Sequence, residues 1–327
     1  MGVHFYDTSP SGPSEQRGRL TCTLPLVKAN IPCVVWGEDA LSIVHFVPTC
    51  LFTQHLIVPD SQVANAAQLI CSHLPYTREG DARNEHWIDL KFHNPACAHA
   101  FDIEGGATIE LFHNDVGQAV RDESPTLIFV HSASTVHFDI GDPSRTMLNP
   151  EPPGPEFASI RFPNAPAFYD MCIDAYHEGP HPFVQFRLRG WLTTLISYLN
   201  LYTVSNKGET FTIDETTQER ILLPSVSNVV ARVKEENRPM LLRRLLHLSP
   251  LHFPHSVLER RDLKQERMQR LGQPYKPPTG IPYDRFSHKE HPEPRLTPFL
   301  LKKPDGGLHV QWRPLARYLS LAKRMAW

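Results

Sequence analysis

The sequence predicts an α+β or α/β protein, in which a mixed sheet with flanking helices is followed by a mostly helical C-terminal region. The main observation is the stretch from Ile31 to Asp60. Its apolar run Ile31–Trp36 is typical of a buried strand, Gly37 indicates a tight turn, and Glu38–Phe46 has helical spacing with apolar residues on one side. A second apolar run, Leu51–Val58, completes a strand–turn–helix–strand unit in which a sheet is covered by a helix.

Alternating and helical patterns extend this unit. Apolar residues recur at helical spacing from Ser61 to Leu74, and Ser61 is suited to cap that helix. The residues of His86–His93 and Ala107–His113 alternate between apolar and polar, which predicts half-buried strands. Gly105-Gly106 is a hairpin signal before the second of them. Two further strands are expected at Thr126–His131 and Thr135–Ile140.

Residues 141–156 are the clearest linker, since they contain five prolines and two glycines. We therefore expect a disordered lead-in over 1–19, an α/β domain over 20–145, and a mostly helical, basic region over 157–327. Helices are expected at 165–178, 190–202, 239–248, 256–271 and 315–325, and hairpins at 210–223 and 299–312. Ser256 with Glu259 forms a capping box for the fourth helix, and Gly272 stands at its C-terminal cap.

Charge is unevenly distributed along the chain. Residues 201–327 hold 22 Lys and Arg against 13 Asp and Glu, whereas residues 1–200 hold 11 against 22. The favoured interpretation is internal complementarity, in which the acidic and basic parts dock on each other. The alternatives are an acidic partner, either nucleic acid or membrane lipid, for the basic region.

The compartment is expected to be the cytoplasm, with the nucleus as an alternative. The six cysteines are scattered without a CxxC motif, which is typical of free thiols in a reducing environment. Residues 1–16 have neither the basic nor the apolar segment of a secretory signal. No window approaches eighteen uninterrupted apolar residues, so no membrane span is predicted.

The Ile31–Asp60 stretch resembles the beginning of the nucleotidyltransferase fold. In that superfamily a helix follows a Gly at the end of a first element, and the next strand carries two aspartates one residue apart before a run such as Leu-Leu-Val. Here that run is Leu56-Ile57-Val58, and the two acidic positions fall on Thr53 and His55. The chain also resembles uncharacterised filamentous-fungal proteins, a resemblance that implies no particular chemistry.

The resemblance implies a site whose paired acids are missing. Active members use the acids to hold two Mg²⁺ ions on the triphosphate, and hydroxyl and imidazole are poor substitutes because Mg²⁺ prefers anionic oxygen. The degenerate catalytic positions are Thr53 and His55, and no resident cofactor or metal is expected. Gly37 and Glu38 are the candidate cofactor-binding residues. If the acids were rearranged, the candidate metal ligands would be Asp39, Asp89 and Glu110, with Mg²⁺ and a nucleotide.

Other motifs give weaker indications. His93, Cys97 and His99 could supply three zinc ligands, but no second paired set accompanies them. Ser132 and Ser134 lie between histidines without a GxSxG motif, and the sequence has neither a P-loop nor GxGxxG. The basic residues of 256–271 alternate with acids, so pairing on the helix surface explains them as well as phosphate contacts do.

Three hypotheses remain open at this point. The leading one is a non-catalytic nucleotidyltransferase-like protein that acts as an intracellular binding or accessory protein, in a fungal pathway. The second is an active nucleotidyltransferase that modifies a small molecule or a protein. The third is a nucleic-acid-associated protein that uses the basic C-terminal region. A nucleotide or protein partner is compatible with the first, nucleic acid is not favoured, and no membrane partner is expected.

Overall fold

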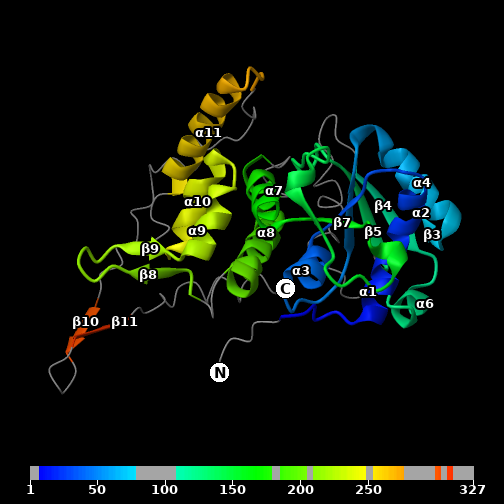
Figure 1. The fold of residues 1–327 in the computed structure, drawn as a ribbon, viewed down its shortest axis with the longest axis horizontal. Coiled ribbons are helices and arrows are strands. Elements are labelled where there is room, and N and C mark those ends of the chain that lie inside the picture. The colour runs from blue at the N-terminus through cyan, green and yellow to red at the C-terminus, as the bar shows by residue number, and fades with distance from the viewer. Residues whose placement is uncertain are drawn as a thin grey trace, which may run out of the picture. The chain divides into compact units, whose positions relative to one another are not determined.

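A computed structural model describes residues 7–78, 108–178, 185–204, 209–247, 253–275, 299–302 and 308–311. The chain divides into two units, Met1–Pro278 and Thr279–Trp327. In the second unit the described residues form one antiparallel hairpin of β10 (Phe299–Lys302) and β11 (Leu308–Gln311). This agrees with the hairpin predicted for 299–312. The first unit contains the main fold (Figure 1).

A seven-stranded mixed sheet forms the centre of the first unit, in the order β3-β4-β5-β2-β1-β7-β6. The β2–β5 and β1–β7 pairs are parallel, and the other neighbouring pairs are antiparallel. The sheet is therefore mixed, as predicted. Its strands are β1 (Val34–Trp36), β2 (Gln54–Val58), β3 (Tyr76–Thr77), β4 (Thr108–His113), β5 (Leu127–Ser132), β6 (Thr146–Leu148) and β7 (Arg161–Pro163).

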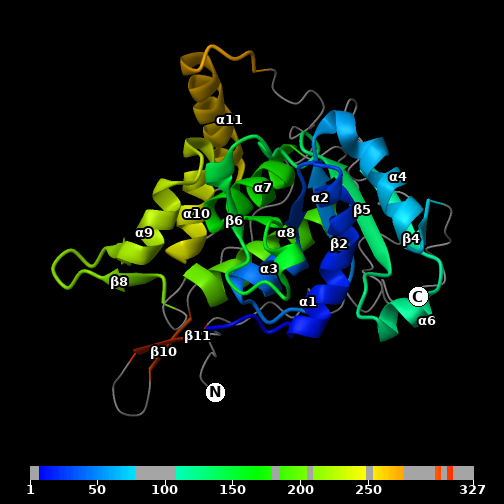
Figure 2. The same ribbon diagram turned by 45° about the vertical axis from the view of Figure 1, so that its right-hand side comes forward.

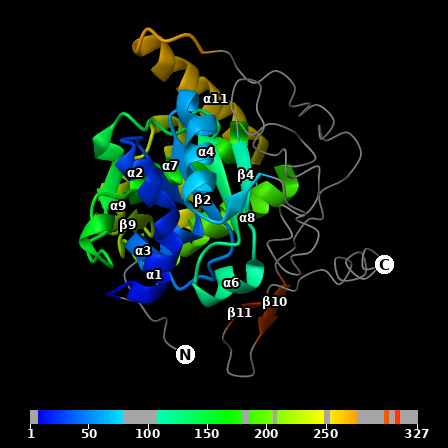
Figure 3. The same cartoon turned by 90° about the vertical axis from the view of Figure 1, so that its right-hand side faces the viewer.

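Helices cover both faces of this sheet (Figures 1 and 3). On one face lie α1 (Pro13–Leu20), α2 (Leu24–Lys28) and α4 (Val63–His73), and on the other lie α3 (Glu38–His45), α7 (Ala165–Glu178) and α8 (Gln185–Leu199). The short helix α6 (Val116–Arg121) connects β4 to β5. Strands β1, β2 and β5 are fully buried between these layers, which explains why they are near-continuous apolar runs.

A third group of helices lies beyond α7 and α8, on the side away from the sheet (Figure 2). It contains α9 (Pro224–Ala231), α10 (Arg238–Leu245) and α11 (Phe253–Arg270), with the short helical turn η7 (Glu235–Asn237) between them. A small hairpin, β8 (Phe211–Ile213) with β9 (Arg220–Leu222), precedes this group. None of the described helices is long and apolar enough to cross a membrane.

The strand–Gly–helix–strand unit is confirmed, with shorter strands than the apolar runs. Helix α3 begins directly after Gly37, whose φ of 73° lies in the left-handed region, and ends at Phe46, which is also left-handed. Helix α3 connects strands β1 and β2, which pair with each other in antiparallel orientation. A side chain at position 37 would place its Cβ 3.1 Å from the His55 ring, so both the backbone conformation and the space require glycine.

The predicted boundary near residue 150 is wrong. The Pro-rich residues 141–156 contain the edge strand β6 and most of the loop that leads to β7. Strand β6 pairs with β7, and β7 pairs with β1. Prolines there serve a loop at a sheet edge, and both flanking parts belong to the first unit. The predicted 20–145 and 157–327 domains are therefore not separate bodies.

The lead-in predicted as disordered over 1–19 is also helical from Pro13 onward. Its composition is polar, but Gln16 and Arg19 are buried and form hydrogen bonds with Asn149 and Asp39. The strand expected at Thr135–Ile140 is instead a series of turns. Helix α11 begins at Phe253, so Ser256 lies within it and is not its cap, whereas Gly272 adopts the left-handed conformation expected of a C-terminal cap.

Several predicted elements fall where the structure gives no description. These are the alternating segment His86–His93, the Gly105-Gly106 turn and the terminal helix 315–325. The predicted helix 165–178 coincides with α7, and the hairpin at 210–223 coincides with β8 and β9.

Gly18 and Gly190 form a matched pair for testing the packing of α1, since each is the sixth residue of its helix. A Cβ at Gly18 would lie 2.3 Å from the backbone oxygen of Asp122, whereas a Cβ at Gly190 meets nothing within 4 Å. We expect Gly190→Ala to stabilise the protein by about 0.5–1 kcal/mol through helix propensity. Gly18→Ala should instead destabilise it by about 1–3 kcal/mol through overpacking. Urea unfolding of both variants checks this, and equal effects would contradict the close packing of α1.

Candidate functional site

The degenerate position His55 lies in a row of residues that crosses four strands. Trp36 of β1 pairs with His55 of β2, His55 pairs with Phe129 of β5, and Phe129 pairs with Glu110 of β4. Directly paired residues share one face of a sheet. The row therefore brings His55 and the candidate acid Glu110 to the same face, with Phe129 between them.

A hydrogen-bonded chain of four side chains runs along this face. Thr53 Oγ1 lies 3.1 Å from His55 Nε2, His55 Nδ1 lies 2.9 Å from His131 Nε2, and His131 Nδ1 lies 3.0 Å from Thr108 Oγ1. The two imidazole N–H groups and one threonine hydroxyl supply one hydrogen for each of the three bonds. The chain is thus satisfied with both histidines neutral, and both nitrogens of each ring are engaged.

Aromatic rings enclose the histidine pair. The His55 ring stacks on His131 and Phe129 with centroids 5.2 Å away in each case. Trp36 meets His55 edge-on at 5.7 Å, and Trp191 of α8 lies 5.0 Å from it. Each of these five side chains is at least 97% buried. The position where the resemblance places metal-binding acids is therefore filled by packed rings.

Burial keeps His131 and His45 uncharged. It lowers the pKa of His131 to about 3. It also lowers the pKa of His45 on α3 to about 4, although the hydrogen bond between His45 Nε2 and the Pro163 carbonyl oxygen raises it. Neutral rings suit a packed interior because an imidazolium would lose its hydration there.

The candidate cofactor-binding residues Gly37 and Glu38 lie against the same face. Trp191 Nε1 donates a 2.6 Å hydrogen bond to Glu38 Oε1. This bond joins α3 to α8 directly above the histidine pair. Glu38 is 4% exposed, so the carboxylate at the start of α3 fixes the covering helix.

The candidate acid Asp39 forms a buried ion pair with Arg19 of α1. Arg19 Nε and Nη2 each donate to one Asp39 carboxylate oxygen at 2.7 Å. The same guanidinium donates to the backbone oxygens of Phe52 and Thr53 at 2.9 and 3.2 Å. Asp39 is fully buried, and the ion pair ties α1, α3 and the segment that leads into β2. This carboxylate has a structural role here.

The remaining predicted ligands do not gather into a described metal site. Glu110 is half-buried on β4, whereas Asp89, His93, Cys97 and His99 lie outside the described residues. Among the described residues there is no group of three or more His, Cys, Asp or Glu side chains that could hold a metal ion. Ser132 and Ser134 are hydrogen-bonded to each other and Ser132 also to Thr135, within the turn that follows β5.

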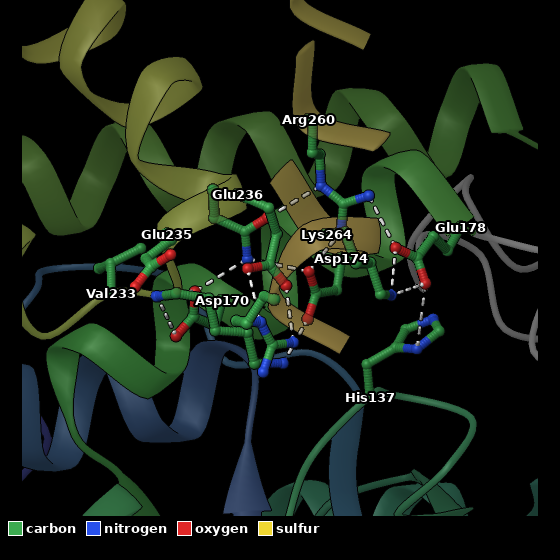
Figure 4. Close-up of polar contacts among 12 residues, drawn as sticks. His137, Asp170, Asp174, Glu178, Val233, Glu235, Glu236, Arg260 and Lys264 are labelled. Atoms are coloured by element: carbon green, nitrogen blue, oxygen red, sulfur yellow. Dashed lines mark hydrogen bonds and ion pairs between the residues drawn. The ribbon is translucent and has the colours of Figure 1, made fainter. Parts of the chain in front are cut away.

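A second polar cluster joins α7 to η7 and α11 (Figure 4). Asp170, Asp174 and Glu178 occupy successive turns of α7 and face cations from other segments. Arg260 donates to Asp174 and Asn237 and pairs with Glu178, while Lys264 pairs with Glu178 and Lys234 with Asp174. Further along α11, Arg267 pairs with Glu236 and Arg270 with Glu235. Much of the basic surface predicted for α11 is therefore neutralised within the first unit.

Because the cluster is buried, each charged side chain strongly affects the pKa of its neighbours. Burial by itself would raise the pKa of Asp174, but the neighbouring Lys234 and Arg260 outweigh it and hold that pKa well below its ordinary value. The same partners keep Lys234 charged, since the pKa of Lys234 is raised despite its burial. These side chains therefore remain ionised inside the protein.

Sequence patterns missed His131, Trp191 and Arg19, which complete the site from β5, α8 and α1. Each lies outside Ile31–Asp60, so no spacing within that stretch indicates the contact. The strand predicted at Thr126–His131 would have placed His131 and Phe129 on one face, because side chains alternate along a strand. A scan against protein-family models, a search of curated proteins and a search of solved structures all find no match for this chain.

Histidine burial predicts a specific pH dependence of stability. A histidine whose pKa is lower in the folded than in the unfolded state stabilises the fold above about pH 6.5, and this contribution is lost as pH falls toward the folded pKa. Each such histidine adds about 1.4 kcal/mol per pH unit to the slope. His45→Gln retains a donor for Pro163 and should reduce the slope between pH 6 and 4.5 by about that amount. Urea unfolding across pH measures it, with exposed His73→Gln as control; an unchanged His45→Gln slope would contradict the assignment.

The buried cluster predicts a large effect for one aspartate. Asp174→Ala removes the ion pair of Lys234 and leaves Arg260 with Glu178 alone, and it should destabilise the protein by about 3–5 kcal/mol. Asp262→Ala on α11 is the matched control, because its ion pair with Arg261 is exposed and should contribute less than about 1 kcal/mol. Chemical denaturation of both variants provides the test, and a small effect of Asp174→Ala would show that the cluster does not hold α11.

Proposed function

We propose that this protein is a non-catalytic relative of the nucleotidyltransferase fold that acts as a binding or accessory protein. The observation that carries the proposal is the hydrogen-bonded chain Thr53–His55–His131–Thr108 under Trp36 and Trp191. It occupies the sheet face where the resemblance expects two metal-binding carboxylates. A satisfied, aromatic-lined chain of neutral groups is a core arrangement, whereas a two-metal site needs anionic oxygens open to substrate.

The rearranged-acid alternative receives little support from the described residues. Two metals in such sites lie about 3.5–4 Å apart, so their ligands must converge closely. Glu110 lies two strands from His55, which corresponds to about 10 Å between backbones, and Phe129 stands between them. Asp39 is held by Arg19 at both oxygens. Nothing in the described arrangement brings the candidate carboxylates to a common point.

The proposed binding role rests on the strand–Gly–helix–strand unit and on the contacts that fix the helices around it. The strand–Gly–helix–strand unit is intact, and buried ion pairs and hydrogen bonds fix its surrounding helices. A protein surface built on such a frame suits a protein partner or a small ligand. The nucleic-acid alternative is weakened because Arg260, Lys264 and Arg267 of α11 are paired with carboxylates of α7 and η7.

Nucleotide chemistry provides the test. The full-length protein is incubated with each of the four α-³²P-labelled ribonucleoside triphosphates and Mg²⁺ or Mn²⁺, in the presence of candidate protein and small-molecule acceptors. We expect no label on the protein or on any acceptor, and no shift of Tm that requires the divalent ion. Label transfer or a Mn²⁺-dependent nucleotide shift would overturn the proposal.

The variants Asp89→Asn and Glu110→Gln separate a true signal from contamination. Both remove carboxylates that the rearranged-acid alternative requires and that the proposal leaves without a catalytic role. Transfer that disappears in these variants would establish the alternative. Transfer that persists unchanged in both would point to a contaminating enzyme, and the assay is then repeated with protein purified to constant specific activity.

A further inference from the structure

A pocket of about 600 Å³ lies on the opposite side of the sheet from the histidine pair. Arg17 of α1 and Thr21, directly after this helix, form one wall, and the C-terminal end of α6 forms another. Leu74, Pro75 and Tyr76 contribute apolar surface, and His113 comes from the end of β4. Because side chains alternate along β4, His113 is on the face opposite to Thr108 and Glu110. The volume is within the range of small-molecule sites.

His113 is the informative residue in this pocket. It is 92% buried, and its Nδ1 accepts a 3.1 Å hydrogen bond from the backbone N–H of Asp115. A neutral imidazole whose Nδ1 accepts must carry its proton on Nε2. No side chain or backbone group in the described part of the chain accepts that Nε2–H. The Nε2–H is therefore available to a ligand in the pocket that offers a hydrogen-bond acceptor.

Two guanidinium groups border the same pocket. Arg17 donates to the Pro153 carbonyl oxygen and Arg121 donates to the Gln118 side-chain oxygen. These acceptors are neutral, and neither arginine forms an ion pair with a described residue. Guanidinium groups are well suited to carboxylate and phosphate.

The pocket also carries acids, which restrict the orientation of a ligand. Asp122 and Glu123 are exposed, and both oxygens of Asp122 accept from Gln118 Nε2. Gly18 packs against the backbone of these two residues so closely that a Cβ would lie 2.3 Å from the Asp122 oxygen. The acids thus lie at the rim of the pocket, whereas His113 is largely buried.

We propose that this pocket binds a small organic anion. Its carboxylate or phosphate group accepts from His113 Nε2–H and meets Arg17 and Arg121, while its apolar body lies against Leu74, Pro75 and Tyr76. The site is independent of the proposed loss of catalysis, since it shares no residue with the histidine pair. Binding here would survive even if nucleotidyl transfer were found.

Probes of one shape and different charge test the proposal. Benzoate and phenyl phosphate are the anions, benzamide is the neutral control and benzylamine is the cation, each titrated into the full-length protein with detection by isothermal calorimetry and saturation-transfer NMR. We expect saturable binding of an anionic probe and weaker binding of benzamide and benzylamine. Absence of saturable binding by both anions, or a preference for benzylamine, would overturn the proposal.

Two substitutions of His113 make the test specific. His113→Asn keeps an acceptor in place of Nδ1 and deletes the inward donor, so the affinity for the anion should fall about tenfold. His113→Gln keeps a donor in place of Nε2 and should retain most of the affinity. Unchanged affinity in folded His113→Asn would contradict the role of His113, and Tm and circular dichroism establish that each variant is folded.

The arginines are tested with a matched surface control. The double variant Arg17→Gln/Arg121→Gln removes two exposed cations at the rim and should weaken anion binding several-fold, with a smaller effect at high salt. Arg161→Gln is the control, because Arg161 is also exposed and donates to the hydroxyl of Thr146 on the distant β6–β7 edge. Equal weakening in the control and the double variant would show that the effect is one of net charge alone.

Discussion

The packing of Trp191 against His55 and Trp36 determines what the central sheet can do. Trp191 brings α8 onto the sheet face, and its indole N–H binds Glu38 at the start of α3. These contacts need the sharp turn at Gly37, where a Cβ would lie 3.1 Å from the His55 ring. In this arrangement the sheet face around His55 is part of the hydrophobic core. Hydrogen bonds between neutral groups join Thr53, His55, His131 and Thr108 within it.

Charge is used elsewhere, at the junction between the sheet layers and the last helices. Helix α7 supplies Asp170, Asp174 and Glu178. Arg260 and Lys264 of α11 and Lys234, which precedes η7, pair with Asp174 and Glu178, and Arg145 pairs with Asp170. These pairs explain part of the uneven distribution of charge along the chain. The acidic helix α7 lies in residues 1–200, which are rich in Asp and Glu, and its partner α11 lies in residues 201–327, which are rich in Lys and Arg. Burial makes the pairs depend on one another, because removing Asp174 takes a carboxylate from both Lys234 and Arg260.

Local patterns predicted much of the fold and little of the site. The strand–Gly–helix–strand unit, α7 and the β8–β9 hairpin follow from apolar spacing and turn residues within one segment. The site could not be predicted in the same way, because its other residues come from distant segments. His131 and Trp191 follow His55 by 76 and 136 residues, and Arg19 precedes it by 36 residues. Composition was misleading at two places. The Pro-rich residues 141–156 contain the edge strand β6 and most of the loop that leads to β7, and polar residues of α1 are buried because Arg19 and Gln16 form long-range hydrogen bonds.

The account depends most on the claim that the face around His55 excludes metal and nucleotide. Histidine-selective ¹³C and ¹⁵N labelling, with assignment by single substitutions, allows the His55 and His131 imidazole signals to be followed while Mn²⁺ and a non-hydrolysable ATP analogue are added. Paramagnetic Mn²⁺ broadens the signals of nuclei near its binding site. We predict that the His55 and His131 line widths remain unchanged and that their nitrogen shifts show neutral rings at pH 7. Selective broadening of either histidine at substoichiometric Mn²⁺ would contradict the account.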